Sequence, residues 1–505
     1  MGGTRRYEGV VAALSLQADG EAPLFRQIYS QLRNAILLGQ LFAGSRLPSS
    51  RTLARHLGVA RNTVLDAYDQ LKAEGYLEGH VGSGTVVARD LPDDCRPLPV
   101  PAASFDNVDG PRDGSACFTP FAEAACAGPQ DLNPLAGRAF EIDLPAEDAF
   151  PYATWCRLTA HVFRRRPREV LSIGDPAGYE PLRHAIASHL GPTRGIACTA
   201  NEVLITSGSQ HAVDLLVRSL LRPGEAVLIE DPGERGVRAN LVAAGMTPVP
   251  IPVDGEGLRV DVLKAKGTGA RMVYVTPSNQ YPLGGTMSMP RRLALVRWAN
   301  YTGGWIIEDD CDSEFRHVDL PLVSLKGLDD RGSVIYVGTF SRSLLRSLRV
   351  GYVVAARPLI DALVQVRSIV DRHPPPIEQA LIAEFMERGH FAAHIRRMRR
   401  LYHDRQRYLI DVAKMHLENL IELRSNGTGM HLVGWLPPHL NDVEVAACAA
   451  RYGLVVRPLS HFYHDGIGPR PALLVGYSGV TTGQVRTGIS VLASVLREQS
   501  LSKPH

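Results

Sequence analysis

Residues 91–118 divide this chain more clearly than any other feature of its sequence. The stretch LPDDCRPLPVPAASFDNVDGPRDGSACF is dense in proline, aspartate, glycine and alanine and has little hydrophobic periodicity, which is typical of a linker. A chain of 505 residues is also too long for one ordinary hydrophobic core. We therefore expect one domain over residues 22–89, a linker over 90–133 and a larger domain over 137–498.

The rest of the sequence predicts a cytoplasmic protein without a membrane span. No apolar run reaches the roughly 18 residues that a span needs, and the start, MGGTRRYEGV, lacks the apolar stretch of a signal peptide. The seven cysteines are an odd number and are scattered without metal-binding spacing. This pattern favours neither a disulfide framework nor a metal site.

The first domain has the pattern of a winged helix-turn-helix. Residues Pro23–Leu38 form an amphipathic pattern with an apolar stripe that includes Ile28 and Leu32. Two short helices follow, and two short strands around a glycine-rich tip then form a wing. The expected bounds are Arg51–Leu57 and about Ala60–Leu71 for the helices, with Ser49 or Ser50 as the cap and Gly58 at the turn, and Gly75–Leu77 and Gly82–Val87 for the strands.

The same domain carries the charge and the residue types that bind double-stranded DNA. From Ala22 to Arg89 there are eight basic residues against four acidic ones, which favours contact with phosphates. Because Arg61, Asn62 and Thr63 open the second short helix, we expect them to contact base edges. The predicted DNA-contacting set is Arg46, Ser49, Ser50, Arg51, Arg61, Asn62, Thr63, Gly82 and Ser83. A merely solvated basic face is the alternative.

The segment RLPSSRTLARHLGVARNTVLDAYDQLKAEGYLEGHVGSGTVV resembles the GntR family of bacterial regulators over nearly the whole first domain. One departure is Ala60, where that family often has a serine. The resemblance implies a sequence-specific DNA-binding regulator of transcription.

From about residue 140 onward, helical patterns alternate with short β-rich runs, which predicts an α/β domain with a mainly parallel sheet. The runs are Glu202–Thr206, Ala226–Glu230, Arg271–Thr276, Gly304–Ile307 and Val334–Val337. Stretches such as VLITSGSQHAVDLLVRSLLRPGEAVLIEDPG, VYVTPSNQYPLGGTMSMPRR and WIIEDDCDSEFRH resemble fold-type I aminotransferases. They are most similar to the MocR/GabR subfamily, in which that fold is joined to a GntR-type domain.

This second resemblance implies a site for pyridoxal 5'-phosphate. Residues Gly208-Ser209-Gln210 follow a β-rich run and open a helix, so their backbone N–H groups can hold a phosphate. By resemblance, Ser341 and Arg349 flank the same phosphate cup, Asp309 faces the pyridine nitrogen, and Asn279 lies on the loop near the ring hydroxyl. The predicted ligand-binding set is Gly208, Ser209, Gln210, Asn279, Asp309, Ser341, Arg342 and Arg349.

Three residues depart from the aminotransferase pattern in that one pocket. Arg342 stands where the Schiff-base lysine belongs, Cys311 replaces a tyrosine, and Glu234 replaces the aromatic residue that stacks on the ring. Because a guanidinium cannot supply the free amine of an imine, we expect no catalytic residue and non-covalent, weak cofactor binding at best. An ion pair with Glu234 or Asp309 is the expected structural role of Arg342.

The sequence therefore predicts a homodimeric transcriptional regulator whose aminotransferase-like domain senses a small anionic metabolite. Two alternatives remain. One is a working pyridoxal-phosphate aminotransferase with a DNA-binding head, and the other is a dimerisation module that binds no ligand.

Overall fold

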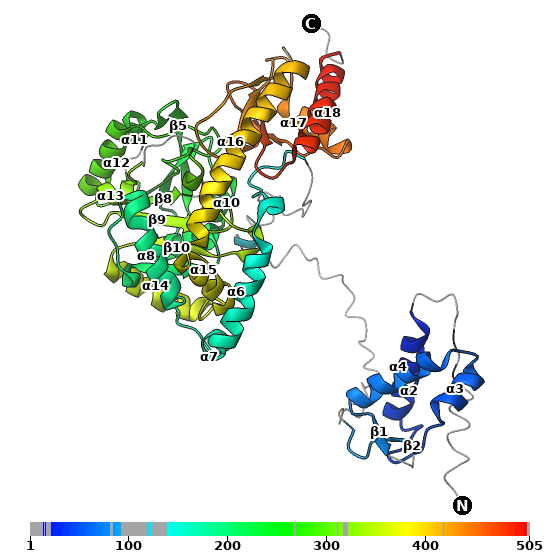
Figure 1. Ribbon diagram of the computed structural model, residues 1–505. Helices are drawn as coiled ribbons and strands as arrows, with labels where there is room; N and C mark the ends of the chain where they lie inside the picture. The colour runs from blue at the N-terminus through cyan, green and yellow to red at the C-terminus, as the bar shows by residue number, and fades with distance from the viewer. Residues whose placement is uncertain are drawn as a thin grey trace, which may run out of the picture. The chain divides into compact units, whose positions relative to one another are not determined.

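The computed structural model describes residues 22–80, 84–91, 121–123, 139–266, 269–310, 312–316, 322–417 and 419–501, together with Leu14, Leu16 and Thr119. The chain divides between Gly114 and Ser115 into two compact units (Figure 1). The expected bounds of 22–89, 90–133 and 137–498 stay predictions at their ends. Among the described residues, no helix is long and apolar enough to cross a membrane.

The first unit contains the expected three helices and a two-stranded wing. Helices α2, α3 and α4 bury one apolar core that includes Ile28, Leu32 and Val64. The Ser49 hydroxyl caps α3 by accepting a hydrogen bond from the Thr52 amide at 3.2 Å. Gly58 ends α3 in the left-handed region, where glycine is favoured. The bounds are α2 Leu24–Leu37, α3 Ser50–Leu57, α4 Arg61–Ala73, β1 Leu77–His80 and β2 Gly84–Val87.

The wing differs from its prediction in the position of its first strand. Strand β1 begins at Leu77 instead of Gly75, because α4 continues to Ala73 and the chain needs the next residues to turn. The two strands are antiparallel, with Leu77 opposite Val87. Gly82 and Ser83, which were expected at the tip, lie outside the described residues.

The second unit is built on a sheet of eight strands in the order β3-β10-β9-β8-β7-β4-β5-β6. The five strands from β9 to β5 are parallel, whereas β10 is antiparallel to both of its neighbours. This arrangement confirms the predicted mainly parallel sheet and its five β-rich runs. The strands are β3 Val203–Thr206, β4 Ala226–Asp231, β5 Thr247–Asp254, β6 Gly257–Leu258, β7 Met272–Val275, β8 Trp305–Asp310, β9 Val334–Thr339 and β10 Gly351–Val354.

Helices cover both faces of this sheet (Figure 1). Alternate residues of a strand point to opposite faces, so Ile335 and Val337 of β9 share a core with α9, α10 and α14, whereas Val334 and Tyr336 join cores on the other face. The bounds are α6 Tyr152–Arg165, α7 Pro167–Leu171, α8 Glu180–Arg194, α9 Ser209–Leu220, α10 Arg235–Ala243, α11 Val260–Lys266, α12 Met289–Thr302, α13 Leu325–Leu328, α14 Arg357–Val370 and α15 Pro376–Glu387.

A second, antiparallel sheet in the order β11-β12-β14-β13 completes this unit. The segment 139–150, which we call the entry segment, runs beside it, because the Gly476 amide donates to the carbonyl of the buried residue Phe140 at 2.9 Å. The remaining bounds are α16 His390–His416, β11 Glu422–Leu423, β12 His431–Trp435, α17 Asp442–Arg451, β13 Arg457–Pro458, β14 Ala472–Gly476 and α18 Thr482–Leu501.

Candidate DNA-binding surface and ligand site

The predicted DNA-contacting side chains gather at the starts of α3 and α4. Arg51, Arg61 and Asn62 are exposed, and Thr63 is half-buried. The Arg61 Nε donates to the Ser50 hydroxyl at 3.3 Å, which joins the two helix starts. Ala60 precedes α4 without a side-chain cap, so the first N–H groups of this helix stay open to a phosphate.

Arg46 lies beside the wing. The backbone of Arg46 forms a β-bridge with Val86. The Arg46 guanidinium lies close to Gly84, and a Cβ atom added to that glycine would be 3.2 Å from it. An exposed basic side chain between the wing and the helices is well placed to contact the DNA backbone.

In the second unit, the carboxyl ends of the parallel strands meet at one edge of the sheet, where ligand sites of open α/β sheets form. Asp309, near the end of β8, is buried and accepts a hydrogen bond from the Tyr274 hydroxyl at 2.6 Å. The buried Asn279 donates to Asp312 at 3.3 Å. Arg342 follows β9 at the same edge. We call the enclosed space between these residues the ring pocket, and its free volume is about 20 Å³.

Arg342 occupies the ring pocket and is held by two carboxylates. Its Nη1 lies 2.8 Å from Asp312 Oδ2, its Nη2 lies 3.2 Å from Asp143 Oδ2, and its guanidinium carbon stands 4.9 Å from the centre of the Tyr281 ring. Asp312 and Asp143 are thus partners of Arg342 that the sequence did not predict, and the predicted pairing with Glu234 or Asp309 stays a prediction. Asp143 lies in the entry segment, far from Arg342 in sequence, and only the packing of that segment brings the two together.

Burial and crowding of carboxylates set the protonation of this region. Burial raises the pKa of Asp312, and the charge of Arg342 opposes that rise. Burial also raises the pKa of Glu234 to about 7, while the positive charge of Arg342 lowers it and the negative charge of Asp143 raises it. Arg342 is therefore the main source of positive charge for these carboxylates.

Two residues of the predicted phosphate cup, Gly208 and Arg349, lie close together, and the cup as a whole stays a prediction. Gly208 takes a φ of 90° just before α9, and the Arg349 guanidinium lies so near that an added Cβ at Gly208 would meet its Nη2 at 3.1 Å. Arg349 Nη2 also donates to the Ser207 carbonyl at 3.1 Å. The buried Ser341 hydroxyl has no hydrogen-bond partner among the described residues. A helix start, a guanidinium and a free hydroxyl are the groups that bind an anion.

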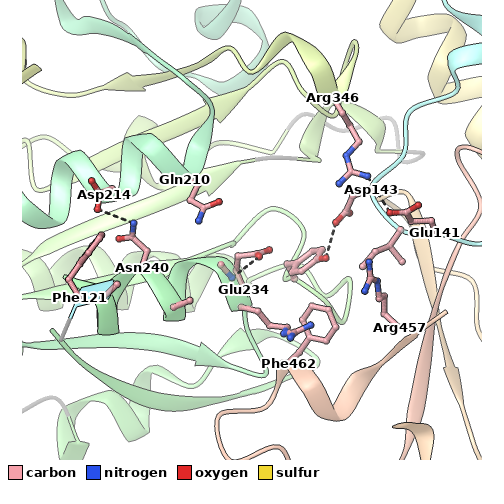
Figure 2. Close-up of a pocket in the computed structure, with 16 residues that line it drawn as sticks. Phe121, Glu141, Asp143, Gln210, Asp214, Glu234, Asn240, Arg346, Arg457 and Phe462 are labelled. Carbon is pink, nitrogen blue, oxygen red and sulfur yellow. Dashed lines mark hydrogen bonds and ion pairs between the residues drawn. The ribbon is translucent and has the colours of Figure 1, made fainter. Parts of the chain in front are cut away.

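A larger cavity of about 470 Å³ opens beside the ring pocket, and Glu234 and Tyr281 line both (Figure 2). Of the predicted ligand-binding residues, Gln210 lines this cavity and Asn279, Asp309 and Arg342 line the ring pocket. Cys311 lies outside the described residues. Sequence reasoning assigned no role to six charged residues of the cavity wall: Glu141, Asp143, Asp214, Arg235, Arg346 and Arg457.

Two protein families match the two units. Residues 24–87 match "Bacterial regulatory proteins, gntR family", and residues 154–492 match "Aminotransferase class I and II". Together the matches cover the winged helix-turn-helix and almost all of the second unit.

Individual relatives share both units. The chain is 37% identical to the "Probable rhizopine catabolism regulatory protein MocR" of Rhizobium meliloti over 95% of each sequence. It is 32% identical to the "HTH-type transcriptional regulator TauR" of Rhodobacter capsulatus over 96% of this chain and 99% of that protein. Among solved structures, α-aminoadipate aminotransferase LysN from Thermus thermophilus, complexed with N-(5'-phosphopyridoxyl)-L-leucine, aligns with a TM-score of 0.71 and 27% identity over 76% of this chain and 98% of LysN.

Proposed function

This chain belongs to the MocR-type regulators of the GntR family, and on that premise we propose that it binds specific DNA sequences and regulates transcription in response to a small molecule. The observation that carries the proposal is the similarity to MocR and TauR, which extends over both units. The exposed Arg61 and Asn62 at the start of α4 supply donors that can read guanine and adenine.

We further propose that the second unit senses its ligand without performing transamination. The residues at its ring end do not fit a covalently bound pyridoxal phosphate, since Arg342 offers no free amine and its guanidinium is engaged by Asp312 and Asp143. The ring pocket leaves only about 20 Å³ around it. Any pyridoxal phosphate is then held without a covalent bond.

The residues of the predicted phosphate cup favour a ligand that carries an anionic group. The unpartnered Ser341 hydroxyl and the Arg349 guanidinium, together with the start of α9 at Ser209, favour a phosphate or a carboxylate. An anion of either kind would satisfy Ser341.

We also propose that the chain forms a homodimer through its second unit, as the aminotransferase fold implies. Two DNA-binding heads carried by one dimer would raise the effective concentration of the second head on DNA. Light scattering on the purified chain at micromolar concentration should give twice the mass of one chain, and a monomer would refute this proposal.

Selection from a random pool of double-stranded DNA tests the DNA-binding function directly. The purified full-length chain should enrich a defined sequence, and Arg61→Ala should lose that preference. Lys72→Ala is the matched control, because it removes one positive charge from the far end of the same helix, where Lys72 pairs with Asp69 at 3.2 Å. A wild-type chain that enriches no sequence would refute the function.

A further inference from the structure

The side chain of Arg342 closes the ring pocket that it lines. The pocket keeps a free volume of about 20 Å³, which is room for about one water molecule. Hydrogen bonds hold other walls of the pocket in place. The Tyr274 hydroxyl donates to Asp309 at 2.6 Å, and Asn279 donates to Asp312 at 3.3 Å. Arginine has a long side chain with many rotamers, so a molecule larger than water enters the ring pocket by moving Arg342.

Arg342 cannot leave the pocket without giving up two ion pairs. Its Nη1 lies 2.8 Å from Asp312 Oδ2, and its Nη2 lies 3.2 Å from Asp143 Oδ2. The two carboxylates belong to different parts of the second unit. Asp312 follows β8 and lines the ring pocket, whereas Asp143 lies in the entry segment. A movement of Arg342 therefore acts directly on the entry segment.

The backbone on both sides of Asp143 is anchored beside the antiparallel sheet. The Phe140 carbonyl accepts a hydrogen bond from the Gly476 amide at 2.9 Å. The Leu144 carbonyl accepts one from the Ser478 hydroxyl at 2.6 Å. Between these anchors, the Asp143 side chain reaches the ring pocket at the edge of the eight-stranded sheet. Asp143 thus joins the entry segment to the carboxyl ends of the parallel strands.

The contacts of Asp143 hold its backbone in an unfavourable conformation. Its φ is 63°, which non-glycine residues adopt at a cost and keep only where the surroundings hold them. Arg342 supplies one such contact, and the Tyr281 hydroxyl supplies another by donating to Asp143 Oδ2 at 2.8 Å. Loss of the Arg342 contact would let this part of the entry segment relax.

We propose that the ion pair between Arg342 and Asp143 is a latch. When the latch is closed, Arg342 shuts the ring pocket and Asp143 fixes the entry segment. A molecule that enters the ring pocket displaces Arg342, breaks the ion pair and releases the entry segment. This segment follows the predicted linker in sequence, so the latch connects the ring pocket to the part of the second unit nearest in sequence to the winged helix-turn-helix. The inference rests on the proposed sensing function and deepens it by naming its regulation.

Hydrogen exchange of the backbone amides in residues 139–150 of the purified full-length chain measures the release. Asp143→Asn removes the charge of the latch but keeps an oxygen that accepts from Tyr281, and asparagine tolerates the left-handed φ. Loss of a partly buried ion pair should raise the exchange rate of these amides about tenfold or more. Urea unfolding followed by tryptophan fluorescence establishes that the variant is folded.

A second readout uses 4-deoxypyridoxine 5'-phosphate, an analogue of pyridoxal phosphate that has no aldehyde and forms no covalent bond. Because this probe has to displace Arg342, Asp143→Asn should bind it about tenfold more tightly than the wild type does. In the wild type, the bound probe should speed the exchange of residues 139–150, whereas a molecule that only packs on the segment would slow it. A purely structural role of Asp143 would instead give weaker binding in the variant.

The matched control is Glu141→Gln, which removes a negative charge from the same segment and the same end of the larger cavity (Figure 2). Glu141 pairs with Arg346 at 3.5 Å, and the Arg346 side chain is 50% exposed, so this ion pair contributes little. Both readouts should change less than about threefold in this variant. The control shows whether loss of negative charge alone explains tighter binding of a phosphate.

The latch is overturned if residues 139–150 of Asp143→Asn exchange as slowly as those of the wild type. It is also overturned if this variant binds 4-deoxypyridoxine 5'-phosphate no more tightly than Glu141→Gln does. DNA selection on the same preparations separates the two proposals. A chain that enriches its DNA sequence but fails either test refutes only the latch, whereas a chain that enriches no sequence refutes the proposed function.

Discussion

Removing the Arg342 guanidinium should destabilise the second unit by about 2–4 kcal/mol at neutral pH. Breaking one side of a buried ion pair costs about 3–5 kcal/mol when the partner is left unpaired. Asp312 is almost fully buried, but the side chains of Arg342 and Asp143 are 15% and 17% exposed, so access of water reduces that cost. Arg342→Met keeps the aliphatic length and removes the charge, and it is the variant to measure.

The pH dependence of this deficit follows from the carboxylates. Burial already raises the pKa of Asp312, and Arg342 opposes the rise, so the pKa should rise further in Arg342→Met. The folded variant then binds the Asp312 proton more tightly than the unfolded chain does, and its stability increases as the pH falls through the folded-state pKa. The deficit relative to the wild type should therefore shrink in acid.

Urea unfolding followed by tryptophan fluorescence measures this unit alone, because all four tryptophans belong to it: Trp155, Trp298, Trp305 and Trp435. Adding Asp312→Asn to Arg342→Met should recover part of the loss, since the buried charge is gone. The reasoning is refuted if Arg342→Met lies within about 0.5 kcal/mol of the wild type at neutral pH, the range of ordinary surface substitutions, or if its deficit does not depend on pH.

Three further predictions concern DNA, protonation and the cofactor. Arg61→Ala should cost about 1–3 kcal/mol on the preferred DNA site and relax one base position, whereas Arg51→Ala should weaken binding to all sequences and flatten its salt dependence; equal losses on specific and random DNA for both variants would contradict the assignment. Burial raises the pKa of Glu234 from 4.5 to about 7, so the wild type should lose stability as the pH rises between these two values. Above pH 7, Glu234→Gln should therefore be more stable than the wild type by about 1–3 kcal/mol. Urea unfolding at pH 5 and pH 8 checks this, and an equal difference at both would count against it. The purified chain should show no visible absorbance of an internal aldimine, and Arg342→Lys should not restore full cofactor binding unless Cys311 and Glu234 are also changed to aromatic residues; a reduced pyridoxyl adduct on the wild type after borohydride treatment, seen by mass spectrometry, would be fatal to this expectation.

The sequence predicted best what is determined by neighbouring residues. The Ser49 cap, the turn at Gly58 and the start of α4 at Arg61 each depend on contacts within a few positions, and all three lie where the sequence pattern indicated. The strand that precedes Gly208 and the helix that follows it were predictable for the same reason.

Strand β5 shows how a local signal can mislead. Its sequence TPVPIPVD has proline at every second position, which argues against a central strand because proline lacks the N–H of the ladder. In the structure, β5 pairs with β4 on one side and is next to the short β6 on the other. Residues two positions apart in a strand direct their backbone nitrogens to the same side. The prolines of β5 can therefore all have their nitrogens on the side of β6, where few ladder hydrogen bonds are needed.

The partners of Arg342 and the walls of the larger cavity could not be predicted from local patterns. Asp143 reaches Arg342 only because the entry segment packs beside the antiparallel sheet, where Phe140 accepts a hydrogen bond from Gly476. Contacts of such long sequence separation leave no periodicity in the chain. The sequence therefore predicted that Arg342 forms an ion pair but did not predict Asp312 and Asp143 as its partners.

The position of β10 affects the order in which the two units can fold during synthesis. Strand β3 pairs only with β10 in the described sheet, so Thr206 must wait for Gly351 to be synthesised before the sheet can close at that edge. The winged helix-turn-helix is complete by Val87, and domains of nascent chains generally fold as units, N-terminal first. A chain that stops before Gly351 should therefore contain a complete winged helix-turn-helix, while β3 lacks its partner strand.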